Sequence, residues 1–493
     1  MRQLRARIAG YYASLGPRYM PFADVTSPDL SAARLLRLSL FQLSVGITLV
    51  LLVGTLNRVM IVELGLPATV VGVMVALPLL FAPFRTLIGH RSDTHRCELG
   101  WRRVPFIWKG TLLQFGGFAI MPFALLVLAG RGEADNAPVL LGYSAAAAAF
   151  LLAGAGAHIV QTAGLALATD LTPPESRARV VGLMYVTLLI GMMASALVFG
   201  ALLSDFSAPK LIRLIQGVAV VCLVLNCVAV WKQEARDRRR KPSAAADDPS
   251  FREAWAHFCK GSQAVRRLAI VGIGTMAFAM SDVLIEPYGG QVLDWSVAST
   301  TKLTALLALG SLFGLLFGSY ALKPQDNPFR MANLAAILGI PALLLVIIAA
   351  PFKVDIAFLL ANFMLGFGAA LFGHATLTAT MNQAPKEQAG LALGAWGAVQ
   401  ATAAGGAMAL GGVLRDLVDA LTGVVGSPPG LPAGASGYLT VYGLEIVLLL
   451  VTILAIVPLI GGRIGRTGKE IAGAGQAAAA QPRLGVQTPH GSS

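Results

Sequence analysis

Charge is scarce in this chain. Only 13% of its 493 residues are Asp, Glu, Lys or Arg, while 56% are hydrophobic. Soluble domains are typically about 25% charged and about 45–50% apolar. The apolar residues gather in runs of roughly 20, the length that crosses the hydrocarbon core of a bilayer as a helix. The composition therefore argues against a soluble protein and predicts a polytopic membrane protein.

Cysteines and catalytic signatures are also few. The four cysteines, Cys97, Cys222, Cys227 and Cys259, are too scattered to form a disulfide framework or a metal cluster. The chain has no H-E-x-x-H, paired C-x-x-C, Walker A or G-x-S-x-G arrangement. Its arginine-rich first 38 residues have no early apolar core and do not read as a secretory signal. These absences favour a carrier or binding protein over an enzyme.

The net charge of +13 would suggest nucleic acid in a soluble protein. Here the basic residues alternate between loops, as the positive-inside rule requires, so nucleic acid is excluded as a partner and the lipid bilayer is expected. Both termini and the Lys- and Arg-rich loops are predicted to be cytoplasmic. The opposite loops hold few basic residues, namely Arg131, Lys210, Arg213, Lys302, Lys353 and Arg415.

The apolar runs predict an all-α membrane protein with twelve spans. We place them at 39–64, 69–90, 104–129, 139–169, 179–203, 211–231, 268–293, 300–321, 331–350, 355–381, 391–414 and 438–462. The chain then divides into a cytoplasmic N-terminal segment, a six-helix bundle, a basic central loop, a second six-helix bundle and a low-complexity tail, at 1–38, 39–231, 232–267, 268–462 and 463–493.

An internal repeat supports two pseudo-symmetric halves. TDLTPPESRARVVG (169–182) and TMNQAPKEQAGLALG (380–394) lie at equivalent places in the two bundles. Paired six-helix halves joined by a long loop indicate the major facilitator fold. After the second span, GHRSDTHRCELGWRR resembles that superfamily's G-x-x-x-D…R-R loop, with matches at Gly89, Asp93, Arg102 and Arg103. We expect Asp93, Arg102 and Arg103 to form a charge cluster that closes the cytoplasmic face.

Ionisable and polar groups inside spans are costly, so they are candidate functional residues. In the major facilitator fold spans 1, 4, 7 and 10 line a central cavity. The candidates in those spans are Asn57, Arg58, Glu63, His158, Asp282, Glu286 and His374. Arg85 and Lys109 lie nearer the cytoplasmic face, where long basic side chains reach the interface.

Two histidines stand near mid-bilayer in apolar, small-residue surroundings. Gly154 lies one turn before His158, and Ala370 one turn before His374. A neutral imidazole is a good axial ligand for a metal, including the magnesium of a chlorin. Small residues on the preceding turn would leave room for a flat macrocycle. The alternative is that each histidine bonds a neighbouring helix and that the small residues serve close packing.

Arg58 and Glu286 are predicted to form an ion pair between the bundles. They lie 19 and 18 residues from the starts of spans 1 and 7, so ideal helices would place them at equal depth near the periplasmic end. Asp282, one turn from Glu286, could share the guanidinium. Alternatively, Arg58 reaches the headgroups and Glu286 caps a bend at Pro287.

Four blocks resemble one known family. They are LNRVMIVELGLPA (56–68), the segment 77–117, QTAGLALATD (161–170) and IEPYGGQVLDWS (285–296). The chain resembles the bacteriochlorophyll delivery family of the major facilitator superfamily, the PucC and LhaA proteins of phototrophic bacteria. The N-terminal YYASLGPRYMPFADV favours the LhaA side, which serves the core antenna LH1.

The resemblance implies a non-enzymatic assembly factor in the bacterial inner or intracytoplasmic photosynthetic membrane. It would bind or deliver bacteriochlorophyll, or a late precursor, and chaperone light-harvesting antenna polypeptides, LH1 rather than LH2. The reaction centre and pigment-synthesis enzymes are further candidate partners. Two alternatives stay open. One is a proton-coupled exporter of a lipophilic solute with Asp282 or Glu286 as proton carrier, and the other is a pigment-free membrane chaperone.

Overall fold

The computed structural model describes residues 31–80, 101–130, 138–173, 176–234, 263–322, 326–352, 354–383, 389–425 and 434–461. Within these ranges the regular secondary structure is entirely helical. Eleven of the described helices are long and apolar enough to cross a membrane, and a shorter apolar helix lies within the predicted second span. The all-helical membrane architecture predicted from the apolar runs is confirmed.

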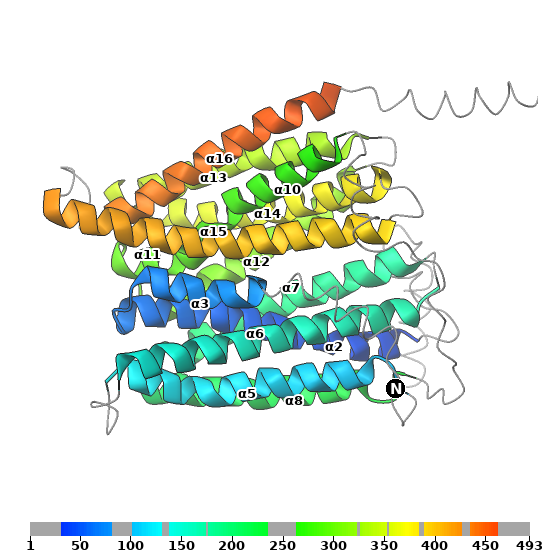
Figure 1. Cartoon of the computed structure of the whole chain (residues 1–493), viewed down its shortest axis with the longest axis horizontal. Coiled ribbons are helices and arrows are strands. Elements are labelled where there is room, and N and C mark those ends of the chain that lie inside the picture. The colour runs from blue at the N-terminus through cyan, green and yellow to red at the C-terminus, as the bar shows by residue number, and fades with distance from the viewer. Residues whose placement is uncertain are drawn as a thin grey trace, which may run out of the picture.

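The N-terminal helices pack on one another in the lower half of Figure 1. The first span is one long helix in three parts, α2 with the π-helical segments η3 and η4. The bounds of this bundle are α2 (Ala32–Leu49), η3 (Val50–Leu56), η4 (Val59–Glu63), α3 (Ala68–Leu80), α5 (Val104–Leu128), α6 (Val139–Asp170), α7 (Arg177–Leu202) and α8 (Ala208–Val230).

The C-terminal helices form the upper half of the same view. The seventh span is interrupted, so that it comprises α10, the short 3₁₀ turn η7 and α11. The bounds are α10 (Ala264–Ala279), η7 (Ser281–Val283), α11 (Ile285–Gln291), α12 (Val297–Ala321), α13 (Pro328–Phe352), α14 (Asp355–Gln383), α15 (Ala389–Val425) and α16 (Ala435–Gly461).

Two helix pairs join the bundles, α3 with α15 and α7 with α12. These pairs are span 2 with span 11 and span 5 with span 8. A pseudo-two-fold axis that relates span 2 to span 8 and span 5 to span 11 exchanges the two pairs. Small residues permit the close approach. A Cβ added at Gly72 would lie 2.9 Å from the Met408 carbonyl oxygen, and one at Gly412 would collide with the Ala68 carbonyl. Without a hydrophobic drive between helices in lipid, such close backbone packing is a main source of association.

The seventh span is broken where the sequence predicts a continuous helix. The break at Ser281–Val283 leaves backbone groups without intrahelical partners, and two polar side chains bond them. Glu445 of α16 accepts a hydrogen bond from the Ser281 amide at 2.7 Å, and Asn57 donates to the Val283 carbonyl at 2.8 Å. Irregular backbone at membrane depth is tolerated only where neighbours satisfy it in this way. Asn57 therefore ties the first span to the break in the seventh.

The eleventh span is longer than its hydropathy suggests. It was predicted to end at 414, but α15 continues to Val425. Arg415, which the charge pattern assigned to a loop, is therefore helical, together with Asp416 and Asp419. Their charges ended the apolar run in the sequence. In the structure they bond to one another and to neighbouring helices, so the helix does not need to stop.

Candidate functional site

A cavity of about 230 Å³ lies between the two bundles. Its wall comes from α2, η3, α3, α6 and α7 on one side, and from η7, α11, α12, α14 and α15 on the other. Most of the lining is apolar. The polar lining residues are Thr48, His158, Gln161, Asp282, Glu286, Thr304 and Asn362. A second cavity, of about 330 Å³, lies against α10 and α14 and shares Asp282 with the first.

Glu286 is the most deeply enclosed acid of the cavity, at 3% exposure. The Thr304 hydroxyl donates to its Oε1, while Oε2 has no hydrogen-bond partner among the described residues. Gly54 of η3 makes room for this arrangement, because a Cβ there would lie 2.7 Å from Glu286 Oε1 and 2.9 Å from the Thr304 hydroxyl. A glycine in the first bundle thus accommodates an acid of the second.

Asn362 and Asp282 bring further oxygen atoms to the same cavity. Asn362 is fully buried, and its Nδ2 donates to the Phe358 carbonyl at 2.8 Å. That bond commits the amide nitrogen, whereas Oδ1 has no partner in the described part of the chain. Asp282 stands on the η7 break and lines both cavities. The cavity therefore combines an apolar wall with a small group of hydrogen-bond acceptors.

The predicted ion pair between Arg58 and Glu286 is wrong. Arg58 pairs with Glu63 of its own span and donates to the Trp295 carbonyl at 3.1 Å. The neighbours of each residue show why the two do not pair. Glu286 packs against Gly54, one turn before Arg58, whereas Arg58 packs against Gly290, one turn after Glu286. The depth comparison assumed ideal α-helices, but the first span is π-helical over Val50–Leu56 and Val59–Glu63 and the seventh is broken. Both departures change the rise per residue.

His158 lines the central cavity and is 8% exposed. Gly154, one turn from His158, also lines the cavity. The ring of Pro78 from α3 packs against it so closely that a Cβ at position 154 would collide with that ring. The small residue therefore serves helix packing in this conformation, which is the packing alternative raised from the sequence. A planar ligand that approached His158 over Gly154 would have to displace α3.

His374 occupies a different environment. It is partly buried, and its ring packs against Gly318 of α12, where a Cβ would lie 2.9 Å from the imidazole Cδ2. Neither His374 nor Ala370, also partly buried, is among the residues that line the two described cavities. The expectation that both histidines face one central cavity is wrong, because helix rotation within the second bundle turns His374 towards α12.

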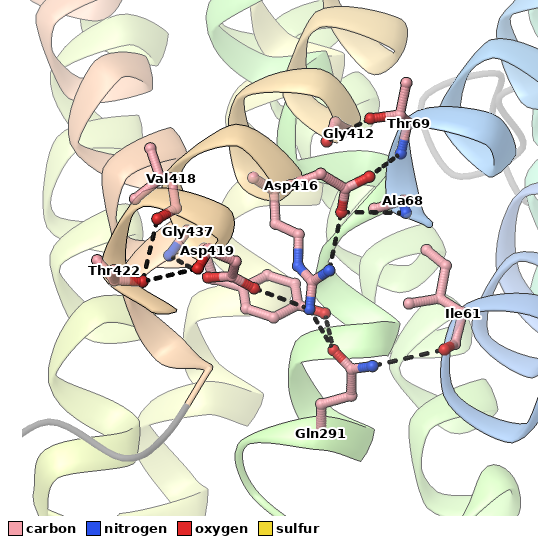
Figure 2. A network of polar contacts seen from close by, with 12 residues as sticks. Ile61, Ala68, Thr69, Gln291, Gly412, Asp416, Val418, Asp419, Thr422 and Gly437 are labelled. Atoms are coloured by element: carbon pink, nitrogen blue, oxygen red, sulfur yellow. Dashed lines mark hydrogen bonds and ion pairs between the residues drawn. The ribbon is translucent and has the colours of Figure 1, made fainter. Parts of the chain in front are cut away.

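A polar network joins the bundles at one end of the molecule, near the ends of α11 and α15 (Figure 2). Asp416 of α15 accepts hydrogen bonds from the backbone amides of Ala68 at 3.2 Å and Thr69 at 2.6 Å, which are the first residues of α3. An acid at a helix N-terminus satisfies free amides and complements the helix dipole. The C-terminal bundle thus supplies the cap for a helix of the N-terminal bundle. We call this end the closed end.

Arg415 holds the network together. Its guanidinium pairs with Asp416 at 2.8 Å and Asp419 at 3.1 Å, and it donates to Gln291 Oε1 at 2.8 Å. Gln291 in turn donates to the Ile61 carbonyl at 3.4 Å. Figure 2 shows these groups converging from α15, α11 and the end of the first span. The predicted topology places this end on the periplasmic side.

A second charge cluster lies at the opposite end, inside the N-terminal bundle. Arg102 and Arg103 both pair with Asp170 at the end of α6, the latter at 3.0 Å. The Glu234 carboxylate accepts hydrogen bonds from the backbone amides of Arg102, Arg103 and Val104 at 2.7 to 3.0 Å, and so caps α5. Both arginines are in a charge cluster as expected, with Asp170 and Glu234 as the partners that the sequence did not indicate. The other predicted members, Gly89 and Asp93, lie outside the described residues.

Comparison with known families settles the ancestry of the chain. The model of the family described as PUCC protein matches residues 55–464. The chain belongs to the PucC family. A PucC protein of Rhodovulum sulfidophilum is 58% identical over 85% of this chain and 92% of its own length. A PucC protein of Rhodobacter capsulatus is 55% identical, with coverages of 91% and 97%. The family predicted from the sequence blocks is confirmed, while the assignment to the LhaA branch stays a prediction.

A more distant relative of this PucC-family chain is described as the bacteriochlorophyll synthase 44.5 kDa chain of Rhodobacter capsulatus. It is 30% identical, over 78% of this chain and 88% of its own length.

Solved transporters share the fold at low identity. The POT family transporter PepTSo gives a TM-score of 0.61 at 12% identity, covering 86% of this chain and 98% of its own. An inward-facing bacterial homologue of Spinster gives 0.59 at 16%, covering 88% and 96%. The major facilitator fold is thereby confirmed.

Several residues of the site and its supports escaped the sequence reasoning, among them Thr304, Asn362, Asp416 and Glu445. Two of them left a visible signal. Glu445 is a lone acid inside the apolar run 438–462, and Asn362 interrupts the run 355–381. Polar groups inside spans are candidates wherever they occur, not only in the spans expected to line a cavity. Thr304 and Asp416 gave no comparable signal.

Proposed function

We propose that this PucC-family protein binds bacteriochlorophyll, or a late precursor, within the membrane and hands it to light-harvesting antenna polypeptides while they assemble. No covalent bond is made or broken in this role. The core antenna LH1 is the preferred recipient, with the reaction centre and pigment-synthesis enzymes as additional partners. The observation that carries the proposal is the buried imidazole of His158 in an apolar cavity at the bundle interface, in a chain of this family.

The chemistry of the lining fits a chlorin. The neutral imidazole of His158 would hold the chlorin's magnesium as a ligand, and the apolar wall would suit the macrocycle. Gln161, which also lines the cavity, offers an amide to the polar edge of such a ring. The bound pigment would supply a magnesium ion that accepts a nitrogen ligand. The protein's part is to present the buried His158 imidazole within an apolar wall and to shield the pigment from other reactions.

The cavity volume sets a condition on binding. At about 230 Å³ it is smaller than the roughly 300–1,000 Å³ of typical ligand pockets. Pro78 fills the space beside Gly154, so room for a macrocycle has to come from a shift of α3 relative to α6. Since α3 also contacts α15, that shift would alter the interface between the bundles. Loading is therefore expected to require a more open conformation.

Absorption spectra of protein purified from pigment-producing cells test the proposal. Wild-type protein should carry bacteriochlorin absorption, and His158→Leu should lose most of it at unchanged expression, because leucine removes the ligand without adding a polar group to the membrane. His374→Leu is the matched control, since His374 does not line the cavity. Pigment-free wild type would favour the pigment-free chaperone. Equal pigment in wild type and His158→Leu would exclude His158 as ligand.

The exporter alternative has its own structural support, because Asp282 and Glu286 both line the central cavity. Flux in proteoliposomes distinguishes it from the assembly role. A proton gradient that drives movement of a lipophilic solute, lost in Glu286→Gln, would support the exporter. Bound antenna polypeptide with no gradient-dependent flux would support the assembly factor.

A further inference from the structure

The lining of the central cavity presents hydrogen-bond acceptors without matching donors. Glu286 Oε2 and Asn362 Oδ1 are both buried and lack partners among the described residues. The Asp282 carboxylate lines the same cavity, and no hydrogen bond or ion pair to it is found in the described part of the chain. The Thr304 hydroxyl is already committed to Glu286 Oε1. Buried acceptors of this kind are destabilising unless a donor or a positive charge reaches them.

The charged and titratable groups around this cluster do not neutralise it through hydrogen bonds. Arg58 interacts electrostatically with Glu286, but its own hydrogen bonds go to Glu63 and to a backbone carbonyl. His158 faces the cavity from α6, in the opposite bundle. Behind the η7 break, Glu445 adds a further acid rather than a base. The missing component is therefore a positive charge or a proton.

Asn362 is the independent observation that points to a ligand. Its nitrogen is held by the Phe358 carbonyl at 2.8 Å, which fixes the amide and leaves a fully buried oxygen at the cavity wall. A structural asparagine in an apolar helix would bond through both ends. Carboxylate and amide oxygens are the usual ligands of hard cations. A proton on Glu286 would equally convert an acceptor into a donor.

We propose that Glu286, Asp282 and Asn362 form a binding site for a monovalent cation, either a proton or an alkali-metal ion, at the bundle interface. Glu286 supplies the charge, Asn362 a fixed neutral oxygen, and Asp282 a second carboxylate on the η7 break. Gly54 permits the close approach of the first span, so the occupied site touches both bundles. The cation site requires no pigment and stands apart from the role of His158.

Thermal unfolding of detergent-purified protein from cells that make no pigment tests the site. One arm exchanges choline chloride for NaCl or KCl at constant ionic strength, and the other lowers the pH. A ligand that binds only the folded protein raises the unfolding midpoint, and a proton bound more tightly in the folded state does so as pH falls. We expect an increase of about 2 °C or more in one arm, and its loss in Glu286→Gln.

Two further variants make the test specific. Asn362→Leu removes the neutral oxygen without changing charge and should weaken the same response, which keeps the test valid if Glu286→Gln does not fold. Asp205→Asn is the control, because Asp205 is an exposed acid 3.7 Å from Lys210 and is not among the residues that line the cavity. A response to alkali ions identifies a metal ion, and one to pH alone identifies a proton. Wild type that responds to neither, or Glu286→Gln that responds like wild type, would overturn the proposal.

Discussion

Removing the carboxylate of Asp416 should open the closed end of the molecule. This side chain accepts two backbone hydrogen bonds from the start of α3 and pairs with Arg415. Asp416→Asn keeps the size of the group but removes its charge. The change weakens both the cap on α3 and the ion pair with Arg415. Only the cap joins the N-terminal bundle to the C-terminal bundle, because Arg415 lies on the same helix as Asp416. The change acts on the closed conformation specifically, because the cap cannot persist once α3 and α15 separate.

The magnitude follows from the contacts. Loss of a helix cap costs about 0.5–2 kcal/mol, and hydrogen bonds to a charged group contribute about 1.5–3 kcal/mol. The Asp416 side chain is 21% exposed, so solvent screens part of the ion pair. We expect Asp416→Asn to destabilise the closed state by about 2 kcal/mol. That free energy corresponds to a roughly 30-fold shift of the equilibrium towards the open state.

Site-directed labelling measures that shift. A cysteine placed at Met408, on the cavity wall, in a background without the native cysteines, should react faster with an impermeant maleimide added from the closed end. Asp419→Asn is the matched control. Asp419 pairs with the same Arg415 at 3.1 Å, but it caps Gly437 at 3.0 Å within the C-terminal bundle. Labelling rates that rise equally in both variants, or in neither, would refute the role of Asp416 as the bond between bundles.

The remaining predictions concern stability, read as the unfolding midpoint in detergent. Arg58→Leu should cost about 2 kcal/mol, below the 3–5 kcal/mol of a fully buried pair because Glu63 is 32% exposed. Arg58→Leu with Glu63→Leu should recover part of the loss, and more of it than Arg58→Leu with Glu286→Leu, because Arg58 pairs directly with Glu63 and only attracts Glu286 without a hydrogen bond. Stronger coupling to Glu286 than to Glu63 would contradict the observed pairing. Glu234→Ala should cost about 1–2 kcal/mol by uncapping α5, and an unchanged midpoint would show that water replaces this cap.

The spans themselves were predictable from the sequence, for a simple physical reason. A segment in lipid must satisfy all its backbone hydrogen bonds internally, so a long apolar run can only be a helix. The same reasoning selected His158, Asp282 and Glu286, because a polar group in such a run is costly without a function. These three residues do line one cavity. The pattern of apolar and polar residues along the chain identifies such groups as candidates, but it does not tell which of them face the cavity.

Only the tertiary structure decided which groups meet. Counting residues at a fixed rise paired Arg58 with Glu286, but the π-helical turns of the first span and the break in the seventh offset them by one turn. The expectation that spans 1, 4, 7 and 10 line the cavity placed both histidines there, whereas packing of α14 on α12 turns His374 towards Gly318. Asp416 appeared in the sequence only as the end of an apolar run, yet it caps a helix 347 residues away in the chain. Helix rotation and register depend on contacts between segments that are distant in the chain. The sequence of a single span does not show which distant residues it will contact.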